Sequence, residues 1–524
     1  MNWKERRELP VGIQDFEKLR TENCVYVDKT EYIYRLTRIG KPYFLGRPRR
    51  FGKSLLISTL KAYFLGKKEL FEGLALAELE KDWVEYPVFH FDFTLGKYDS
   101  MLSFESALDT NLRRIEEQWG RNVLETTAEA RFSGLIRRVY TQTGKRVVVL
   151  IDEYDKPLIS TMEDATLNKA IRENLKGFYG LLKGSDQYLR FVMLTGVTKF
   201  SKVSVFSDLN QLVDISLMEE YAGICGISES ELVNNFEPEI QALAEKRNMT
   251  RETALAELQK RYNGYHFSEN SEGVYNPFSL LNTFFSLTLR YYWFESGTPT
   301  FLINLIKQVD FDIRKFAGDI RINARSIADY RTDNTDPVPI LYQTGYLTIK
   351  GYDQQLDEYI LGLPNEEVKY AFLAELLPVY INKQGKQRDF SAGEFIRELR
   401  SGEVDAFMER IRALFGYMPY ELNDKSERHY QSVFFLIFTM MGQFIQTEVR
   451  SARGRADAVV ILPDTVYVFE FKITGNGTAE EALQQIDDKG YLIPYSVGQR
   501  KTVKIGAEFD PAERTLKRWL IKFD

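Results

Sequence analysis

The amino-acid sequence predicts a protein of several α/β domains. Its 524 residues exceed what one hydrophobic core organises, and at roughly 150 residues per domain they correspond to about three or four compact units. In the N-terminal part, apolar segments such as 146–153 and 190–196 alternate with helical ones, the order that builds a parallel sheet covered by helices. Near the C-terminus, three apolar segments follow one another directly. We therefore expect a multidomain α/β fold with a parallel sheet first and a mixed sheet last.

The first expected domain, residues 1–225, contains the parallel sheet. The segment VVVLI at 147–151 is apolar at every position, as strands buried on both faces are. A helix is expected to begin near Lys53, with apolar side chains on one face, and to stop at Gly66. The other expected elements are strands at 43–45, 87–93 and 190–196 and helices at 102–118, 127–142 and 164–184.

The pattern becomes helical beyond residue 226. Residues 226–365 form the second expected domain, with a candidate winged helix at 340–363, where a helix-like start leads into the strands GYLTIK and EYILGL. Residues 366–524 form the third, a helical connector followed by a core at about 420–524. In that core FIQTEVR, ADAVVIL and TVYVFEFK are expected to be successive strands, followed by a helix at 478–490 and two more strands.

Composition excludes several functions. A net charge of −6 excludes a non-specific nucleic-acid coat, because that affinity comes from a surplus of Lys and Arg. Cys24 and Cys225 are the only cysteines, which excludes a disulfide scaffold and a zinc site built on cysteine. No apolar run approaches the roughly 20 residues that span a bilayer, and the N-terminus has no apolar signal segment. We expect a cytoplasmic protein with no membrane contact.

A phosphate-binding loop is indicated by LGRPRRFGKSLL at 45–56, between a short strand and a helix. Amide groups at the helix start would hold phosphates, Lys53 would neutralise their charge, and Ser54 would coordinate Mg²⁺. Gly46 precedes Gly52 by six positions, one more than the strict G-x-x-x-x-G-K-[ST] pattern allows. The alternative is a basic helix start that contains GKS by chance.

A second motif strengthens the nucleotide interpretation. Asp152 and Glu153 follow the buried strand, so the strand carries both carboxylates to the carboxyl edge of the sheet. There Asp152 would hold Mg²⁺ through water, and Glu153 would polarise the attacking water; a solvated acidic turn is the alternative. Thr195 and Thr198 either sense the terminal phosphate or cap a turn. The residues expected to bind ATP and its metal are Arg49, Arg50, Gly52, Lys53, Ser54, Asp152, Thr195 and Thr198.

A separate metal site is indicated at 454–472. Alternation along a strand puts Glu470 and Lys472 on one face, and a hairpin brings Asp457 beside them. The two carboxylates and the carbonyl of Phe471 are hard oxygen ligands that suit Mg²⁺ or Mn²⁺, and Lys472 would orient water and stabilise charge on a phosphate. This spacing is typical of metal-dependent nucleases. The alternative is an exposed hairpin, but the strand is strongly apolar, so burying Glu470 without a metal or partner would be costly.

Three further residues have weaker support. Glu427, at a helix start, would either add a metal ligand or interact with the helix dipole. Glu448, on the strand before Asp457, is either an additional site residue or an ion-pair residue. Gln485, on the later helix, would contact the DNA backbone or the water on the metal, or belong to a polar helix face.

Taken together, the strings RPRRFGKSLL, IDEYDKP, LTGVTKFSKVSVFSDLNQL, YNGYHF and GRADAVV followed by VFEFK resemble one bacterial family. It joins an AAA-ATPase-like domain to a C-terminal nuclease domain of the PD-(D/E)XK superfamily, and the similarity runs from about Pro10 to the C-terminus. The resemblance implies a P-loop NTPase core and a restriction-endonuclease-like domain. The family shares the lengthened loop. The matching residues are Lys53, Ser54, Asp152, Glu153, Asp457, Glu470 and Lys472; the sensor-two arginine of typical AAA proteins has no clear match.

Two hypotheses of function follow. In the first, ATP binding or hydrolysis controls a Mg²⁺-dependent nuclease that cleaves phosphodiester bonds in nucleic acid, with DNA favoured, and a homo-oligomer or partner protein completes the assembly. In the second, the chain is a nucleotide-dependent switch whose nuclease-like domain binds nucleic acid or protein without cleaving. A winged helix that reads DNA is a third possibility, although residues 340–370 contain few basic side chains.

Overall fold

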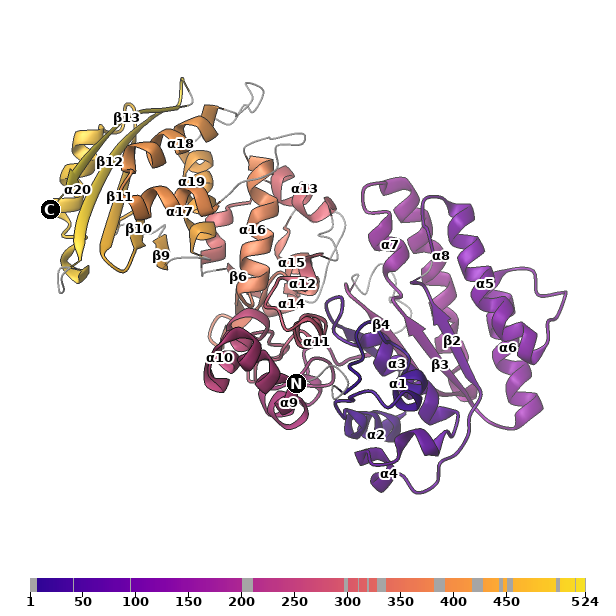
Figure 1. The fold of residues 1–524 in the computed structure, drawn as a ribbon. Coiled ribbons are helices and arrows are strands. Elements are labelled where there is room, and N and C mark those ends of the chain that lie inside the picture. Colours follow the sequence, from indigo (N-terminus) through magenta and orange to yellow (C-terminus); the bar gives the residue numbers. More distant parts are fainter. Residues whose placement is uncertain are drawn as a thin grey trace. The chain divides into compact units, whose positions relative to one another are not determined.

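The computed structural model describes residues 7–40, 42–94, 96–199, 211–295, 300–309, 311–317, 320–327, 336–380, 392–416, 427–442, 446–449, 456–495, 500–513 and 515–523. Contacts divide the chain into two compact units (Figure 1). Unit 1 comprises Met1–Gly297 and Ile320–Glu367, and unit 2 comprises Thr298–Asp319 and Val368–Asp524. Each unit is described by itself.

The first sheet of unit 1 is parallel throughout and has the strand order β2-β3-β4-β1-β5. Its strands are β1 (Pro42–Gly46), β2 (Val88–Asp92), β3 (Val147–Asp152), β4 (Leu189–Gly196) and β5 (Val213–Asp214). All six residues of β3 are buried, because helices cover both faces of a parallel sheet. This sheet and the mixed C-terminal sheet described below confirm the predicted multidomain α/β class.

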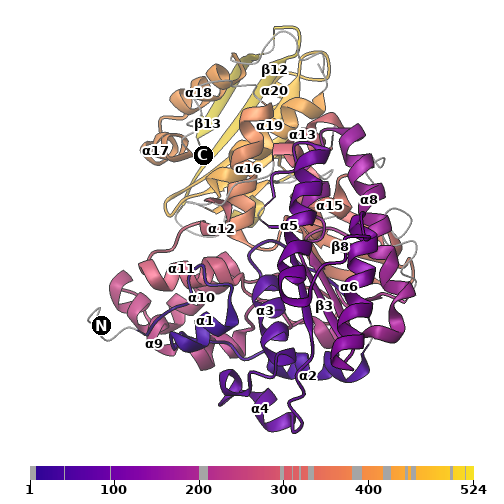
Figure 2. The same cartoon turned by 90° about the vertical axis from the view of Figure 1, so that its right-hand side faces the viewer.

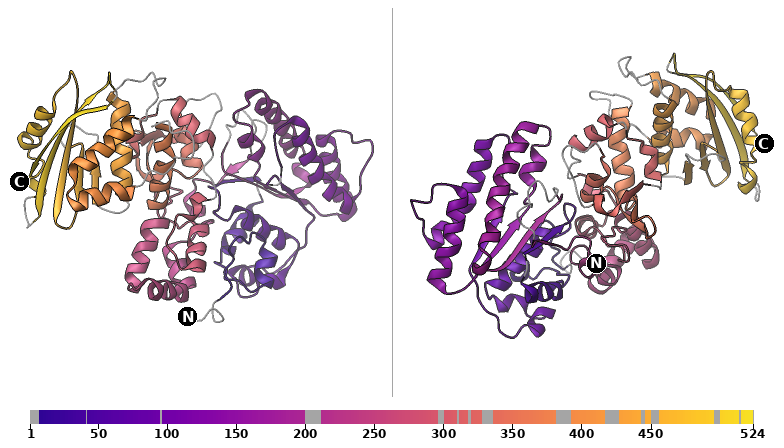
Figure 3. Two further views of the ribbon diagram at one scale, coloured as in Figure 1. Left: turned by 45° about the horizontal axis from the view of Figure 1, so that its top comes forward. Right: turned by 180° about the vertical axis from the view of Figure 1, so that it is seen from behind.

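Two groups of helices lie on opposite sides of this sheet (Figure 3). The first group is α1 (Phe16–Thr21), α2 (Thr30–Ile39), α3 (Lys53–Phe64) and α4 (Ala75–Leu79). The second contains α5 (Met101–Trp119), α6 (Ala128–Thr143) and α8 (Ala165–Gly184), and the short α7 (Lys156–Ser160) packs on α8. Single 3₁₀ turns at Lys68–Phe71, Asp186–Tyr188 and Glu219–Tyr221 connect these elements.

A helical layer follows in unit 1. Helices α9 (Glu229–Arg247), α10 (Arg251–Tyr262) and α11 (Pro277–Ser286) lie side by side (Figure 2) and enclose their own apolar core, which includes Leu243, Leu258 and Phe284. Pro238 lies within α9, and the helix is interrupted at Phe236, two residues before it, as expected where proline removes a backbone bond and crowds the preceding turn.

Unit 1 is completed by short elements and a small sheet. The helices are α12 (Tyr292–Glu295), α14 (Ala324–Ile327) and α15 (Val338–Gln343). The sheet has the order β6-β8-β7 and is antiparallel, with β6 (Ile320–Asn323), β7 (Thr348–Asp353) and β8 (Glu358–Gly362). The helix and hairpin expected at 340–363 thus correspond to α15, β7 and β8; a winged helix stays a prediction.

Unit 2 is built on a mixed sheet with the order β13-β12-β11-β10-β9, in which only β11 and β12 run parallel. The strands are β9 (Gln446–Val449), β10 (Ala458–Ile461), β11 (Thr465–Ile473), β12 (Lys501–Asp510) and β13 (Thr515–Phe523). Helix α20 (Ala479–Asp488) covers one face; α17 (Ala392–Ser401), α18 (Val404–Gly416) and α19 (Glu427–Met441) lie on the other (Figure 1). Four remaining elements are α13 (Thr300–Gln308), the 3₁₀ turns Ile313–Ala317 and Ile493–Tyr495, and α16 (Glu366–Tyr380), which starts in unit 1.

Among the described residues, no helix combines the length and the apolar character needed to cross a bilayer.

Candidate nucleotide and metal sites

The glycine-containing loop connects β1 to α3 at the carboxyl edge of the parallel sheet. Strand β1 ends at Gly46, and α3 begins at Lys53. Two loop residues, Arg50 with φ 69° and Gly52 with φ 95°, adopt the left-handed backbone conformation. No atom lies within 4 Å of the position that a Gly52 side chain would take, so the glycine is favoured by the backbone turn and not by lack of space.

Arg47 anchors the loop, a role that the sequence did not indicate. Its side chain is 1% exposed and donates hydrogen bonds to the carbonyls of Gly46 and Ser216, both at 2.8 Å, and of Tyr221 at 3.0 Å. The guanidinium also lies over the Phe267 ring, 4.0 Å from its centroid. Ser216, Tyr221 and Phe267 come from distant segments, so no local signal could have identified these partners.

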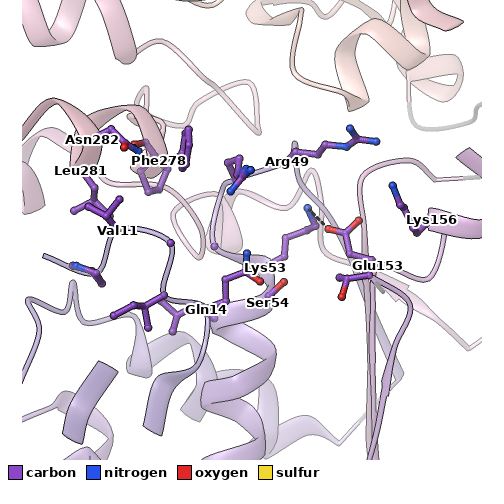
Figure 4. Close-up of a pocket in the computed structure, with 18 residues that line it drawn as sticks. Val11, Gln14, Arg49, Lys53, Ser54, Glu153, Lys156, Phe278, Leu281 and Asn282 are labelled. Atoms are coloured by element: carbon purple, nitrogen blue, oxygen red, sulfur yellow. Dashed lines mark hydrogen bonds and ion pairs between the residues drawn. The ribbon is translucent and has the colours of Figure 1, made fainter. Parts of the chain in front are cut away.

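Lys53 is buried at the start of α3. Its Nζ donates to the carbonyls of Arg47 at 3.0 Å and Pro48 at 3.2 Å. It also lies 3.2 Å from Oε1 of Glu153, which follows β3 (Figure 4). The structure therefore brings the two predicted motifs together, and the ammonium group lies between the loop carbonyls and the carboxylate.

Asp152 lies beside Ser54, as a shared metal site requires. Its Oδ1 accepts a 2.6 Å hydrogen bond from Thr195 Oγ1. Burial raises the pKa of Asp152, while hydrogen bonds from Ser54 and Thr195 act in the opposite direction. Thr195, at the end of β4, thus orients Asp152, because its hydroxyl donates a hydrogen bond to the carboxylate.

Thr198 contacts a different carboxylate. The amide and hydroxyl of Thr198 donate to Oδ2 of Asp155 at 2.6 and 2.7 Å, and the amide of Val197 donates to the same oxygen at 3.0 Å. Asp155 is fully buried, and burial raises its pKa to about 6. Sequence reasoning gave Asp155 no role. The assignment of Thr198 as a phosphate sensor stays a prediction.

A cavity of about 330 Å³ opens at this edge of the sheet, within the size range of small-molecule sites. One end carries charged and polar side chains and the other apolar ones (Figure 4). The charged and polar residues are Arg49, Arg50, Lys53, Ser54, Thr94, Glu153 and Lys156, with Gln14 and Asn282 as further polar residues; the apolar ones include Pro10, Val11, Ile13, Phe278 and Leu281. Sequence reasoning missed Lys156 and the apolar end.

Helices α11 and α12 contact the loop directly. The guanidinium of Arg50 lies 4.5 Å from the centroid of the Phe278 ring on α11. On α12, Trp293 Nε1 donates to the carbonyl of Arg49 at 3.1 Å. The loop is therefore held from outside the parallel sheet as well as by Arg47.

In unit 2, Asp457 and Glu470 meet across neighbouring strands. Antiparallel pairing sets Ala458 opposite Phe469, so Asp457, just before β10, reaches the following residues of β11. Its Oδ2 accepts a 2.9 Å hydrogen bond from the amide of Phe471. Glu470 is 3% exposed, so it is buried in the strand and does not face solvent as in the exposed-hairpin alternative.

Lys472 and Gln485 complete this cluster. Lys472 Nζ lies 3.3 Å from Glu470 Oε1 and donates to Gln485 Oε1 at 2.6 Å. The Gln485 amide donates to Glu470 Oε1 and, at 3.1 Å, to the hydroxyl of Tyr491. Gln485 therefore holds both the carboxylate and the ammonium group, and Tyr491 is a neighbour that sequence reasoning missed.

The surroundings of the Glu470 carboxylate favour a bound cation. Burial and the nearby Asp457 raise the pKa of Glu470 to about 7, and Lys472 acts against this shift. Glu470 Oε2 is buried and accepts no hydrogen bond from the residues that the structure describes, a cost that a bound cation would relieve. Among the described residues, no three His, Cys, Asp or Glu side chains gather at one metal position. A cation here would therefore be held by the carboxylates of Asp457 and Glu470, the Phe471 carbonyl and water. These oxygen donors fit Mg²⁺ or Mn²⁺.

Glu427 is the first residue of α19 and Glu448 lies on β9; both side chains lie outside the described part of the chain. Their predicted roles stay predictions.

Gly506 lets helix α20 approach the sheet. It pairs with Glu470 across the parallel strands β11 and β12. A Cβ atom on Gly506 would lie 2.4 Å from the carbonyl oxygen of Ala479 and 2.6 Å from the amide nitrogen of Leu483, both on α20. Close packing at this point therefore places Gln485 over the carboxylate.

Two family models match the chain. One describes a predicted AAA-ATPase and covers residues 10–206; the other describes the PD-(D/E)XK nuclease superfamily and covers residues 425–519. The protein is thus an AAA-ATPase-like protein with a C-terminal domain of the PD-(D/E)XK superfamily, which confirms the resemblance stated above. It belongs to the same family as a protein of Azotobacter chroococcum mcd 1 described as an uncharacterized protein in the vnfD 5'region. The two are 35% identical over 531 residues, which cover 99% of each chain.

A solved structure of the Aeropyrum pernix ORC2 protein, in ADPNP–ADP complexes, aligns with 68% of this chain and 97% of its own. The identity is 12% and the TM-score 0.27, which is too low to carry an argument. The fold therefore rests on the strand order and the family matches.

Proposed function

We propose that the protein binds and hydrolyses ATP and that the nucleotide controls a Mg²⁺-dependent nuclease that cleaves phosphodiester bonds in DNA. The observation that carries the proposal is the buried carboxylate of Glu470, which lies beside Asp457 and has one oxygen with no hydrogen-bond partner among the described residues. Such a pair is costly to bury unless a cation neutralises it. The cytoplasm, where ATP, Mg²⁺ and DNA occur together, is the proposed location.

In unit 1 the triphosphate would lie over the start of α3. Amides of the loop and of the first helical turn, with Lys53, would hold its phosphates, and Ser54 and Asp152 would hold Mg²⁺. Phosphate would compete with Glu153 for Lys53, which frees Glu153 to accept a proton from the attacking water. The base would occupy the apolar end of the cavity, against Pro10 and Phe278.

In unit 2, Asp457, Glu470 and the Phe471 carbonyl would hold the divalent cation. When bound, the cation supplies positive charge at the phosphate that is cleaved. Gln485 restrains the ammonium group of Lys472 beside Glu470. Lys472 would stabilise negative charge that builds up on the phosphate oxygens during cleavage.

The test is a cleavage assay with plasmid, linear and single-stranded DNA in Mg²⁺ or Mn²⁺, with and without ATP. Glu470→Gln should lower cleavage by about a hundredfold or more. The control is Glu513→Gln, at an exposed turn after β12, which should cleave as the wild type does. If the wild type cleaves none of these substrates, or if Glu470→Gln cleaves equally well, the nuclease proposal is wrong.

The second candidate is a nucleotide-dependent switch that binds nucleic acid or a partner protein, including a second copy of the chain, without cleaving. The ion pair between Lys53 and Glu153 favours this switch. Without nucleotide, Glu153 neutralises the lysine that would bind phosphate, so the nucleotide-free chain has a defined state of its own. Calorimetric titration separates the two candidates. Tight binding of ATP–Mg²⁺ without turnover, together with no Mn²⁺ binding that depends on Asp457, would favour the switch.

A further inference from the structure

Two cationic side chains of the unit 1 cavity take no part in the ion pair between Lys53 and Glu153. Arg49 belongs to the loop, and Lys156 is the first residue of α7, three residues after Glu153. Both line the cavity, and Figure 4 shows both side chains on the Glu153 side of Lys53. Within the part of the chain that the structure describes, neither forms an ion pair with a carboxylate.

Three cationic side chains, Lys53, Arg49 and Lys156, line this end of the cavity. The carboxylate of Glu153 lies 3.2 Å from Lys53. Glu153 and Asp155 also attract Lys156, but neither forms an ion pair with it among the described residues. Burial, followed by the charge of Arg49, lowers the pKa of Lys156. Two partly buried cations that repel each other are unfavourable until an anion comes between them, so the cavity is prepared for a strongly negative group at this position.

Arg50 differs from its neighbour. Its guanidinium lies over the ring of Phe278, at the apolar end, and its side chain is exposed. Among the described residues that line the cavity, the cations at the Lys53 end, besides Lys53 itself, are therefore Arg49 and Lys156.

We propose that Arg49 and Lys156 bind the terminal phosphate of ATP from within the same chain, so that hydrolysis needs no arginine from a neighbouring molecule. This inference rests on the proposed nucleotide site. In the reaction, the water oxygen forms a bond to the γ-phosphorus, the bond between that phosphorus and the β–γ bridging oxygen breaks, and the water proton passes to Glu153. The products are ADP and inorganic phosphate. Arg49 and Lys156 offset the negative charge that develops on the γ-phosphate oxygens.

The first experiment measures affinity for ATP–Mg²⁺ and ADP–Mg²⁺ by competition with a fluorescent nucleotide, using the full chain. Arg49→Ala and Lys156→Ala should each weaken ATP binding by about tenfold or more and leave ADP binding nearly unchanged, because only ATP carries the contacted phosphate. Turnover should fall by about a hundredfold to a thousandfold. The control, Lys169→Ala, removes an exposed lysine from α8 and should bind both nucleotides normally.

The second experiment asks whether the cations act within one chain. Wild-type turnover per molecule should stay constant over about a hundredfold range of protein concentration. Mixing Arg49→Ala with Lys53→Ala chains should not restore turnover, because neither chain has a complete site. Restored turnover would show that Arg49 acts on a neighbour's nucleotide and would overturn the inference.

The outcomes separate the two proposals. If the wild type binds ATP and the Arg49 and Lys156 variants keep its full preference for ATP over ADP, the inference is wrong and the nucleotide site stands. If the wild type binds neither nucleotide, the proposed function itself fails and the inference fails with it.

Discussion

Lys53 Nζ lies 3.2 Å from Oε1 of Glu153, so the residue that would bind phosphate and the residue that would accept a proton neutralise each other. Phosphate binding must break this ion pair. We therefore predict that Glu153→Gln binds ATP more tightly than the wild type, by about threefold to tenfold, because Lys53 is no longer paired with a charge.

Glu153→Gln should also lower ATP turnover by about a hundredfold or more, since the amide of glutamine accepts no proton from water. Equilibrium binding and phosphate release, measured on the same preparation, check both halves. Lys53→Ala is the comparison and should lose ATP binding. Weaker ATP binding by Glu153→Gln would contradict the competition argument.

A pH dependence is expected from Asp155. Burial raises its pKa from 3.8 to about 6 in the folded chain, so between these values the native state holds a proton that the unfolded chain has released. The free energy of unfolding of the wild type should therefore fall, relative to that of Asp155→Asn, as pH rises from about 4 to about 6. Urea denaturation of both proteins across this range measures the difference. A difference that stays constant with pH would contradict the raised pKa.

Gly506→Ala tests the close packing of α20. The added Cβ would lie 2.4 Å from a backbone oxygen of the helix, so α20 must move and take Gln485 away from Glu470. We expect destabilisation by about 1–3 kcal/mol and loss of DNA cleavage. Gly184→Ala is the control, because its Cβ would meet nothing within 4 Å. Thermal unfolding and the cleavage assay measure the two effects; wild-type behaviour of Gly506→Ala would contradict them.

Gln485 is expected to orient Lys472 without binding metal itself. Gln485→Ala removes the 2.6 Å hydrogen bond from Lys472 and should lower cleavage by about tenfold, with Mn²⁺ affinity changed less. Gln485→Glu adds a third carboxylate and should raise Mn²⁺ affinity while cleavage stays low, because Lys472 is then paired with an added charge. Calorimetry with Mn²⁺ and cleavage rates test both. Equal loss of metal binding and cleavage in Gln485→Ala would instead make Gln485 part of the metal site.

The sequence predicted the features that depend on local pattern. The all-apolar run of β3 identified a doubly covered strand, and alternation along β11 put Glu470 and Lys472 on one face, where an ion pair now joins them. The loop between β1 and α3 was recognised from GKS although its spacing was long. Each of these depends on residues that are close in the chain.

Other features could not be predicted because their partners are distant in the chain. Arg47 is held by carbonyls near residues 216 and 221, which only the folded chain brings near. The hydrogen bonds of Asp155 could not be predicted either, because Thr198, whose amide and hydroxyl donate to it, lies 43 residues further along the chain. The phosphate-sensing role of Thr198 stays a prediction. The apolar end of the cavity combines residues 10–13 with α11, and no local pattern connects those segments.

The chain passes between the two units three times, after Gly297, after Asp319 and after Glu367. The third passage falls within α16, whose second residue, Glu367, accepts hydrogen bonds from Ser279 in unit 1. Neither unit is therefore a continuous stretch that a single truncation could release. A fragment beginning at Val368 would lack α13 and start inside a helix. Studies of the nuclease-like domain alone are better done in the whole chain, with the proposed nucleotide site inactivated by substitution.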